Sequence, residues 1–181
     1  MFGKLSTGAK QLQWNHRIVF IMITHKKLLI QIILHFLTIA CMVMIFYFSS
    51  QNAEISLGTS SNLIKNVAKV VIWDFENMPK QQQQQIINDW QNFTRKNAHF
   101  FIFLILGLLT MATMLTYKIK LSSQIIIAFA VVFLYAVSDE IHQIFVQGRA
   151  CRLSDVIIDT VGSSTGMAII VGIRRIFILK P

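Results

Sequence analysis

The stretch AHFFIFLILGLLTMATMLTY, at residues 98–117, carries no acidic or basic side chain apart from His99. A short basic turn, which contains Lys118 and Lys120, joins it to a second apolar stretch, LSSQIIIAFAVVFLYAVS, at residues 121–138. A helix needs about 20 mostly apolar residues to cross a bilayer. We therefore predict that these two stretches are neighbouring membrane-spanning helices joined by a tight connection.

The composition of the whole chain supports a membrane protein. Of its 181 residues, 54% are hydrophobic and only 14% are charged, whereas a soluble domain carries about 25% charged residues. Two further apolar stretches, Leu28–Phe48 and Val156–Leu179, are long enough to span, although two arginines interrupt the second near its end. We predict an all-α polytopic membrane protein with four transmembrane helices. The composition argues against a water-facing enzyme, a disordered tail and a disulfide-stapled secreted fold.

The placement of charges predicts the orientation of these spans. Basic residues without any acid occupy the segment before the first span, the turn between spans two and three, and the segment after span four. The acidic residues all lie in the other two loops or at the span ends beside them. Because cytoplasmic segments collect Lys and Arg, we expect a multi-pass protein of the cell membrane with both termini cytoplasmic. The same rule accounts for the net charge of +9 without a nucleic-acid partner.

The chain divides into a cytoplasmic or interfacial segment, residues 1–27, and a four-helix membrane domain, residues 28–179. The first segment contains the short apolar run Ile18–Ile23, bounded by basic residues, which we expect to be either interfacial or partly buried. Within the membrane domain, residues 49–96 form a long loop between spans one and two, and the orientation places this loop outside.

We expect amphipathic helices in this first external loop. Apolar residues recur at helical spacing within Asn62–Trp73 and again after the glutamine tract at 81–85. Pro79 separates the two stretches and suits the start of the second helix. The two helices either lie at the membrane surface, where Trp73 and Trp90 would be interfacial anchors, or form a lid over a site below.

Polar residues crowd the external ends of all four predicted spans. Polar groups near lipid are costly unless they are paired or face a hydrated cavity, so we expect the four ends to converge on one polar pocket. The predicted binding residues are Gln51, Arg95, Lys96, His99, Asp139, Glu140, His142, Gln143, Arg149, Asp155 and Asp159.

Helical geometry predicts which residues of span four face the other helices. Asp155, Asp159, Gly162 and Gly166 share one face of span four, and the two glycines belong to a small-residue pattern that lets another helix approach closely. Asp159 lies about one turn inside the span, so it needs a cationic partner. We expect Arg149 to be that partner because a guanidinium can hold a carboxylate with two parallel bonds, and Lys96 is the second candidate.

The chemistry of the predicted pocket leaves several interpretations open. His99 is either satisfied by a backbone group or transfers protons, and with Glu140 it is a candidate general acid or base. The acids and His142 lack the spacing of zinc-protease and calcium-loop motifs, so we predict no metal and no cofactor. Ser138 and His142 are four residues apart, as a nucleophile and its base could be, but serines at helix ends are common.

Four short motifs resemble the VanZ-like family of small bacterial membrane proteins. They are Phe48-Ser49-Ser50-Gln51, Arg95-Lys96-Asn97-Ala98-His99-Phe100, Ser138-Asp139-Glu140-Ile141-His142-Gln143-Ile144-Phe145, and Gly148-Arg149 followed by Ser154-Asp155 and Asp159…Gly162. The resemblance implies a role in the cell envelope, since the family takes its name from a member associated with resistance to the glycopeptide teicoplanin. In the family pattern a Tyr often stands where this chain has Phe103, and an Asn commonly stands where it has Asp159.

The sequence is compatible with three functions. The first is a non-enzymatic envelope protein that binds an amphiphile at the outer leaflet, with membrane lipids and a lipid-anchored glycopeptide or cell-wall precursor as partners. The alternative is a membrane enzyme that acts on a lipid-linked phosphate or glycan, with Arg149 and Lys96 holding the phosphate. A transporter ranks last, because only Gln31, His35 and Gln124 offer polar side chains deep in the spans.

Overall fold

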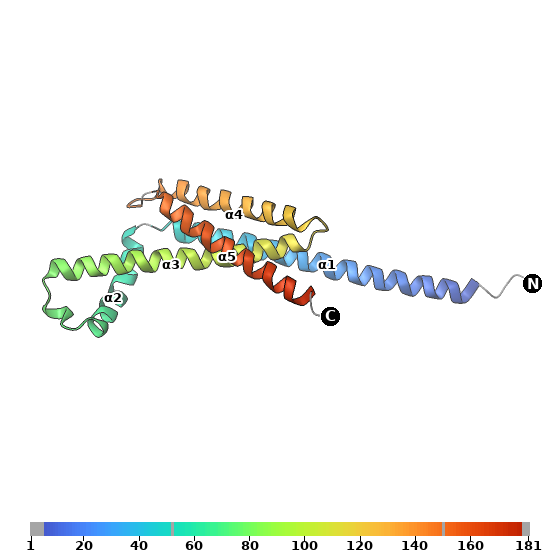
Figure 1. Cartoon of the computed structure of the whole chain (residues 1–181), viewed down its shortest axis with the longest axis horizontal. Helices are drawn as coiled ribbons and strands as arrows, with labels where there is room; N and C mark the ends of the chain where they lie inside the picture. The colour runs from blue at the N-terminus through green and yellow to red at the C-terminus, as the bar shows by residue number, and fades with distance from the viewer. Residues whose placement is uncertain (1–5, 52, 150, 179–181) are drawn as a thin grey trace, which may run out of the picture.

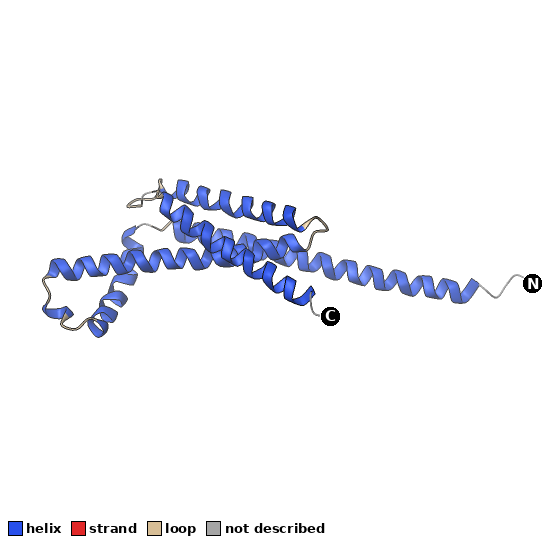
Figure 2. Ribbon diagram, in the orientation of Figure 1, coloured by secondary structure: helices blue, strands red, loops and turns tan. Residues whose placement is uncertain are grey.

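The structure is a computed structural model that describes residues 6–51, 53–149 and 151–178, and it describes side chains from Thr24 onward, apart from those of residues 53–61. Helices account for nearly all of this part of the chain, and it contains no strand (Figure 2). The elements are α1 (Ser6–Ser49), α2 (Ala53–Val71), the 3₁₀ turn η1 (Phe75–Asn77), α3 (Lys80–Leu115), α4 (Leu121–Gln143) and α5 (Leu153–Ile178). The predicted all-α class is therefore confirmed.

Four of these helices contain stretches that are long and apolar enough to cross a membrane. They are Thr24–Ser49, Lys80–Leu115, Leu121–Gln143 and Leu153–Phe177, which confirms the four predicted spans of a multi-pass membrane protein. Many large apolar side chains on their outer faces are exposed, such as Phe36 at 70% and Leu134 at 64%. Such faces are suited to contact with lipid tails.

Two of the spanning helices are longer than the sequence predicts. The first begins at Ser6, so Ile18–Ile23 is part of α1, but the side chains of that run lie outside the described set and their environment stays a prediction. Likewise, the glutamine tract and span two form one helix, Lys80–Leu115, which starts directly after Pro79. The expectation of a separate second helix at the membrane surface is therefore wrong, because α3 continues unbroken into the bundle and projects beyond α4 and α5 (Figure 1).

The projecting part of α3 packs against α2 to form a hairpin with its own small core. Ile64 and Ala68 of α2, Phe75 of η1 and Ile87 of α3 are buried together, and Trp90 packs against them. Trp90 is thus part of a protein core, whereas Trp73 is 95% exposed. Whether the hairpin acts as a lid stays a prediction.

Close backbone contact between α3 and α5 holds the bundle together. A side chain at Gly162 would collide with the carbonyl oxygen of Phe100, and one at Gly166 with that of Leu104. From the opposite helix, a side chain at Gly107 would collide with the backbone of α5. The predicted close approach along the glycine face of span four is confirmed, and the helix that approaches is α3.

The bundle has two distinct ends. We call the end with the 116–120 connection the turn end, and the end at which α4 connects to α5 the site end (Figure 1). Polar side chains at the turn end bond to one another across helices. Gln31 donates to the Thr116 hydroxyl at 3.1 Å, and His35 Nε2 lies 3.1 Å from the Tyr117 hydroxyl. Gln124 donates to the Tyr117 carbonyl oxygen and accepts a bond from Arg174.

Candidate functional site

At the site end, the last turns of α1 and α4 meet the first turns of α5 and the middle of α3. The local sequence explains this junction. Both α1 and α4 end where apolar runs give way to polar residues, and Gly148 adopts a positive φ of 78° that turns the chain back toward α5. A residue with a side chain would be strained in that conformation.

Asp139 is the most firmly held acid of the site. Its side chain is 2% exposed, and one of its oxygens, Oδ2, accepts hydrogen bonds from the Ser49 hydroxyl at 2.8 Å and from the Gln143 amide at 3.0 Å. The other oxygen, Oδ1, is buried without a hydrogen-bond partner. These bonds fix the carboxylate so that Oδ1 faces the interior of the site.

Glu140 has a partner for one of its two oxygens, whereas Asp155 has a partner for each. The backbone N–H of Arg152 donates to Glu140 Oε2 at 2.9 Å, while Glu140 Oε1 is buried and has no partner. Asp155 lies 3.7 Å from the Arg95 guanidinium and accepts a bond from the Ser154 hydroxyl. The Arg152 backbone bond could not be anticipated, because a main-chain donor leaves no trace in the residue pattern.

Asp159 is fully buried, and the basic residue beside it differs from the expected one. The His99 ring nitrogen Nδ1 lies 3.6 Å from Asp159 Oδ1, and both carboxylate oxygens lack hydrogen bonds. The predicted pair with Arg149 is therefore wrong, and Lys96 is not the partner either. His99 occupies the position because it faces Asp159 across the close contact between α3 and α5.

Arg149 instead caps the C-terminal end of α1. Its guanidinium donates to the carbonyl oxygens of Gln51 at 3.1 Å and Phe48 at 3.2 Å. The last carbonyls of a helix lack partners within the helix, so a basic group placed there is favourable. Burial, together with the charge of nearby Arg95, lowers the pKa of Arg149 below its usual value, but a guanidinium remains charged at neutral pH.

His142 also has a local role. Its Nε2 lies 3.0 Å from the Ser50 hydroxyl, and its ring stacks on that of Phe46. Ser138, proposed above as a nucleophile for this histidine, donates its hydroxyl to the Tyr135 carbonyl oxygen instead. No bond between Ser138 and His142 occurs in the described part of the chain, so the geometry gives no support to that pair.

A small pocket opens beside the pair of His99 and Asp159. It contains ≈ 170 Å³ of empty space. Its lining comes from α3 and α5 alone: Arg95, Lys96, His99, Asp155, Ile158 and Asp159. The geometry thus brings five of the predicted binding residues to one pocket. The other six lie outside its lining: Gln51, Asp139, Glu140, His142, Gln143 and Arg149. Ile158 is the one lining residue that the polar pattern missed, since an apolar residue in a span carries no distinguishing signal.

The site as a whole holds more acid than base. Four acids, Asp139, Glu140, Asp155 and Asp159, face three basic residues, Arg95, Lys96 and Arg149. Two of those bases already have partners, because Arg95 pairs with Asp155 and Arg149 with backbone carbonyls. Lys96 is half-buried in the pocket lining and makes no ion pair with any described residue. The pocket therefore offers one cationic group free to bind an anion.

A comparison with protein families gives one match. A family model described as VanZ/LLP1 matches residues 34–177, which include most of the first spanning helix, the other three spanning helices and every residue of the site. No protein of curated function and no solved structure matches the chain.

Proposed function

We propose a binding function for the chain, which belongs to the VanZ/LLP1 family: its pocket holds the anionic headgroup of an amphiphilic component of the cell envelope. In this proposal the site end faces outward from the cell membrane and both termini are cytoplasmic. The basic residues of the turn end, such as Lys118, Lys120 and Arg174, support that orientation.

The proposal rests on the position of Lys96. It lines the pocket without a carboxylate partner, and an ammonium group is a strong binder of phosphate. Its neighbour Arg95 presents a second cation, which Asp155 holds in place at 3.7 Å. A phosphate oxygen in the pocket would lie between these two groups.

The pocket is small and partly open, so we expect the headgroup to sit at its mouth and not inside a closed cavity. Its ≈ 170 Å³ of empty space includes open solvent, so the enclosed part is far smaller than the sites of drug-sized molecules, which have volumes of about 300–1,000 Å³. The exposed apolar faces of the helices would then carry the tail of the amphiphile in the lipid. A cell-wall precursor on a polyprenyl phosphate and a lipid-anchored glycopeptide are the two sources of such a ligand. Binding either one would alter susceptibility to teicoplanin.

Native mass spectrometry of the purified chain with its retained lipids tests this function. We expect a phosphate-bearing amphiphile on the wild-type protein. Its occupancy should fall about tenfold or more in Lys96→Gln, because a hydrogen bond to a charged group contributes about 1.5–3 kcal/mol. Lys65→Gln is the matched control, since Lys65 is an exposed lysine of the hairpin. Equal occupancy in Lys96→Gln, or ordinary phospholipid alone on the wild type, would contradict the proposal.

An enzymatic function is supported by one feature, the unpartnered oxygen of Glu140. A buried carboxylate oxygen without a partner is placed as a general acid or base would need to be, and His99 is the second candidate. If the chain hydrolyses a lipid-linked phosphate, the purified protein will release inorganic phosphate from a polyprenyl diphosphate, and Glu140→Gln will abolish the release.

A further inference from the structure

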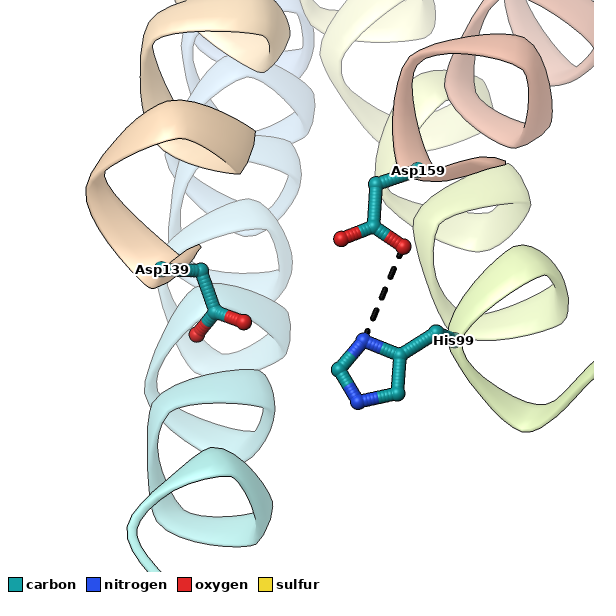
Figure 3. Close-up of side chains that lie close together, drawn as sticks. All are labelled: His99, Asp139 and Asp159. Atoms are coloured by element: carbon teal, nitrogen blue, oxygen red, sulfur yellow. Dashed lines mark ion pairs between the residues drawn. The ribbon is translucent and has the colours of Figure 1, made fainter. Parts of the chain in front are cut away.

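Three side chains from three different helices point into one small space at the site end. They are His99 of α3, Asp139 of α4 and Asp159 of α5, and Figure 3 shows the imidazole and the two carboxylates facing one another. One potential ligand atom from each residue lies within 4.8 Å of the others. The two acids are 2% and 0% exposed, so the protein encloses them almost completely.

The atoms that face this space have no hydrogen-bond partner. They are His99 Nδ1, Asp139 Oδ1 and both carboxylate oxygens of Asp159. Buried polar atoms are nearly always bonded in folded proteins, and leaving one unsatisfied costs about 1–3 kcal/mol. Unpartnered atoms from three helices, gathered in one place, indicate a shared ligand.

The charge of the cluster specifies the kind of ligand. Two buried carboxylates repel each other and are costly at membrane depth unless a cation compensates them. Arg95 pairs with Asp155 and Arg149 bonds to the carbonyl oxygens at the end of α1, so neither makes an ion pair with the two acids. Arg149 acts on Asp139 only from a distance. Among the described residues, His99 is therefore the one basic group that lies against the cluster.

We propose that His99, Asp139 and Asp159 bind a divalent transition-metal ion. Two ligands of a tetrahedral zinc ion, each about 2.0–2.1 Å from it, lie about 3.3 Å apart, and the His99 nitrogen lies 3.6 Å from Asp159 Oδ1. The ligand atoms of the three residues lie within 4.8 Å of one another, so binding of the ion would draw Asp139 closer by up to about 1.5 Å. The combination of imidazole and carboxylate favours zinc, manganese or iron over magnesium and calcium.

The surroundings of the cluster fit a metal site. Metal-binding carboxylates are usually held by further hydrogen bonds that orient them, and Asp139 is held in this way by Ser49 and Gln143 through its other oxygen. Three protein ligands leave a fourth position open, as in catalytic zinc sites. The pocket that contains Lys96 is also lined by His99 and Asp159, so water or an anionic oxygen would reach a bound ion from there.

The metal site does not depend on the proposed headgroup. The unpartnered atoms and the deficit of positive charge belong to the protein alone. A bound divalent ion would, however, make the pocket more favourable for an anion. The experiment therefore measures metal on the purified chain without any lipid ligand.

Zinc binding to the full-length protein in detergent tests the inference. The protein is stripped with EDTA and dialysed against Zn²⁺, and bound metal is counted by mass spectrometry. We expect one ion per chain and a higher melting temperature than that of the stripped protein. His99→Gln, Asp139→Asn and Asp159→Asn should each weaken binding at least about tenfold, as the loss of a metal ligand or its support does. Mg²⁺ should not replace Zn²⁺ at equal concentration.

Asp89→Asn is the matched control, because it makes the same change at an exposed carboxylate of α3, the helix of His99, and lies outside the cluster and the pocket. It should keep the metal. Absence of stoichiometric zinc on the folded wild type overturns the proposal, and so does equal zinc retention by the three cluster variants. Loss of zinc in Asp89→Asn to the same degree would overturn the assignment to these three residues. Each variant is checked by size-exclusion elution, and a variant that does not fold is replaced by His99→Ala or Asp139→Ser at the same position.

Discussion

At the turn end of the bundle, Gln31 and His35 of α1 bond to Thr116 and Tyr117 of the connection between α3 and α4, and Gln124 of α4 bonds to Tyr117 and to Arg174 of α5. The site end, by contrast, holds five buried side-chain atoms that have no hydrogen-bond partner among the described residues. Both ends place polar groups where lipid or protein surrounds them. At the turn end these groups join helices, as interhelical hydrogen bonds do in other membrane proteins. At the site end they remain available.

The difference separates polar residues that serve the fold from those that serve a ligand. An unsatisfied buried group lowers stability, and proteins tolerate such a cost mainly where function needs it. The composition of the two ends would not reveal this, because glutamine and histidine occur at both. Pairing is the property that distinguishes them, and it is visible only in three dimensions.

The proposed orientation predicts an all-or-none difference between the ends. Cys151 is exposed near the site end, while the other cysteine, Cys41, is buried. A membrane-impermeant thiol reagent added to intact cells should therefore label the wild-type chain at Cys151. A Cys151→Ser variant that carries Lys118→Cys at the turn end should resist the reagent until the cells are permeabilised. The reverse pattern would show that the site end faces the cytoplasm.

Glu140→Gln should remove any hydrolytic activity while it leaves the fold intact. The amide oxygen can still accept the bond from the Arg152 backbone, so only the charge of the unpartnered oxygen is lost. If Glu140 acts as the general acid or base, hydrolysis of a lipid-linked phosphate should fall at least about a hundredfold. Occupancy of the anionic headgroup should not fall, because Glu140 lies outside the pocket lining. Gln124→Leu, a change at the turn end, is the control and should retain function. Wild-type activity in Glu140→Gln would remove this residue from the site.

Substitutions at the two ends should change the free energy of unfolding in opposite directions. Gln124→Leu deprives the Tyr117 carbonyl and Arg174 of their partner, and we expect it to lower the free energy of unfolding by about 1–3 kcal/mol. Asp159→Asn removes a buried charge, and in metal-free protein it should raise stability by about 1 kcal/mol. Unfolding in detergent with added denaturant measures both. A destabilised Asp159→Asn would show that the carboxylate serves the fold.

A substitution in the hairpin should have the smallest effect on stability, and that effect should depend on pH. Lys69 lies 2.6 Å from Glu76 in an exposed ion pair, and the Lys69 hydrogen bond and charge lower the pKa of Glu76 below 4.5. A lowered pKa stabilises the folded state above the ordinary pKa, and this contribution is lost as the pH falls through the lowered value. Glu76→Gln should therefore melt slightly lower than wild type at pH 7 and low salt. The two should coincide at strongly acid pH or high salt, and a difference that survives both would contradict the ion-pair explanation.

Much of the fold could be predicted from the sequence because membrane spans depend on length and apolarity alone. The helix that packs on the glycine face was not predicted, since a helical repeat reveals a face and not its neighbour. For the same reason the partner of Asp159 was assigned to Arg149 instead of His99. The continuity of α3 was missed because the glutamine tract looks like a separate surface helix, although glutamine forms helices well.

The sequence predicted which residues gather at the site but not which of them lie next to one another. The crowding of polar residues at one end of every span correctly indicated where to look, and five of the predicted residues line the pocket. Spacing rules could not place His99, Asp139 and Asp159 together, because these residues are far apart in sequence and meet only through tertiary packing. Spacing rules detect ligands that share one helix or loop.

The length of α3 has a mechanical consequence. Its 36 residues extend over about 54 Å at 1.5 Å per residue, and no proline or glycine interrupts them between Lys80 and Gly107. The helix is therefore a stiff lever whose pivot is the glycine contact with α5. His99 and Lys96 lie on the lever arm between that pivot and the hairpin. A sideways push on the hairpin, from the cell wall or from a neighbouring molecule, would be transmitted along the arm and would displace both residues relative to Asp139.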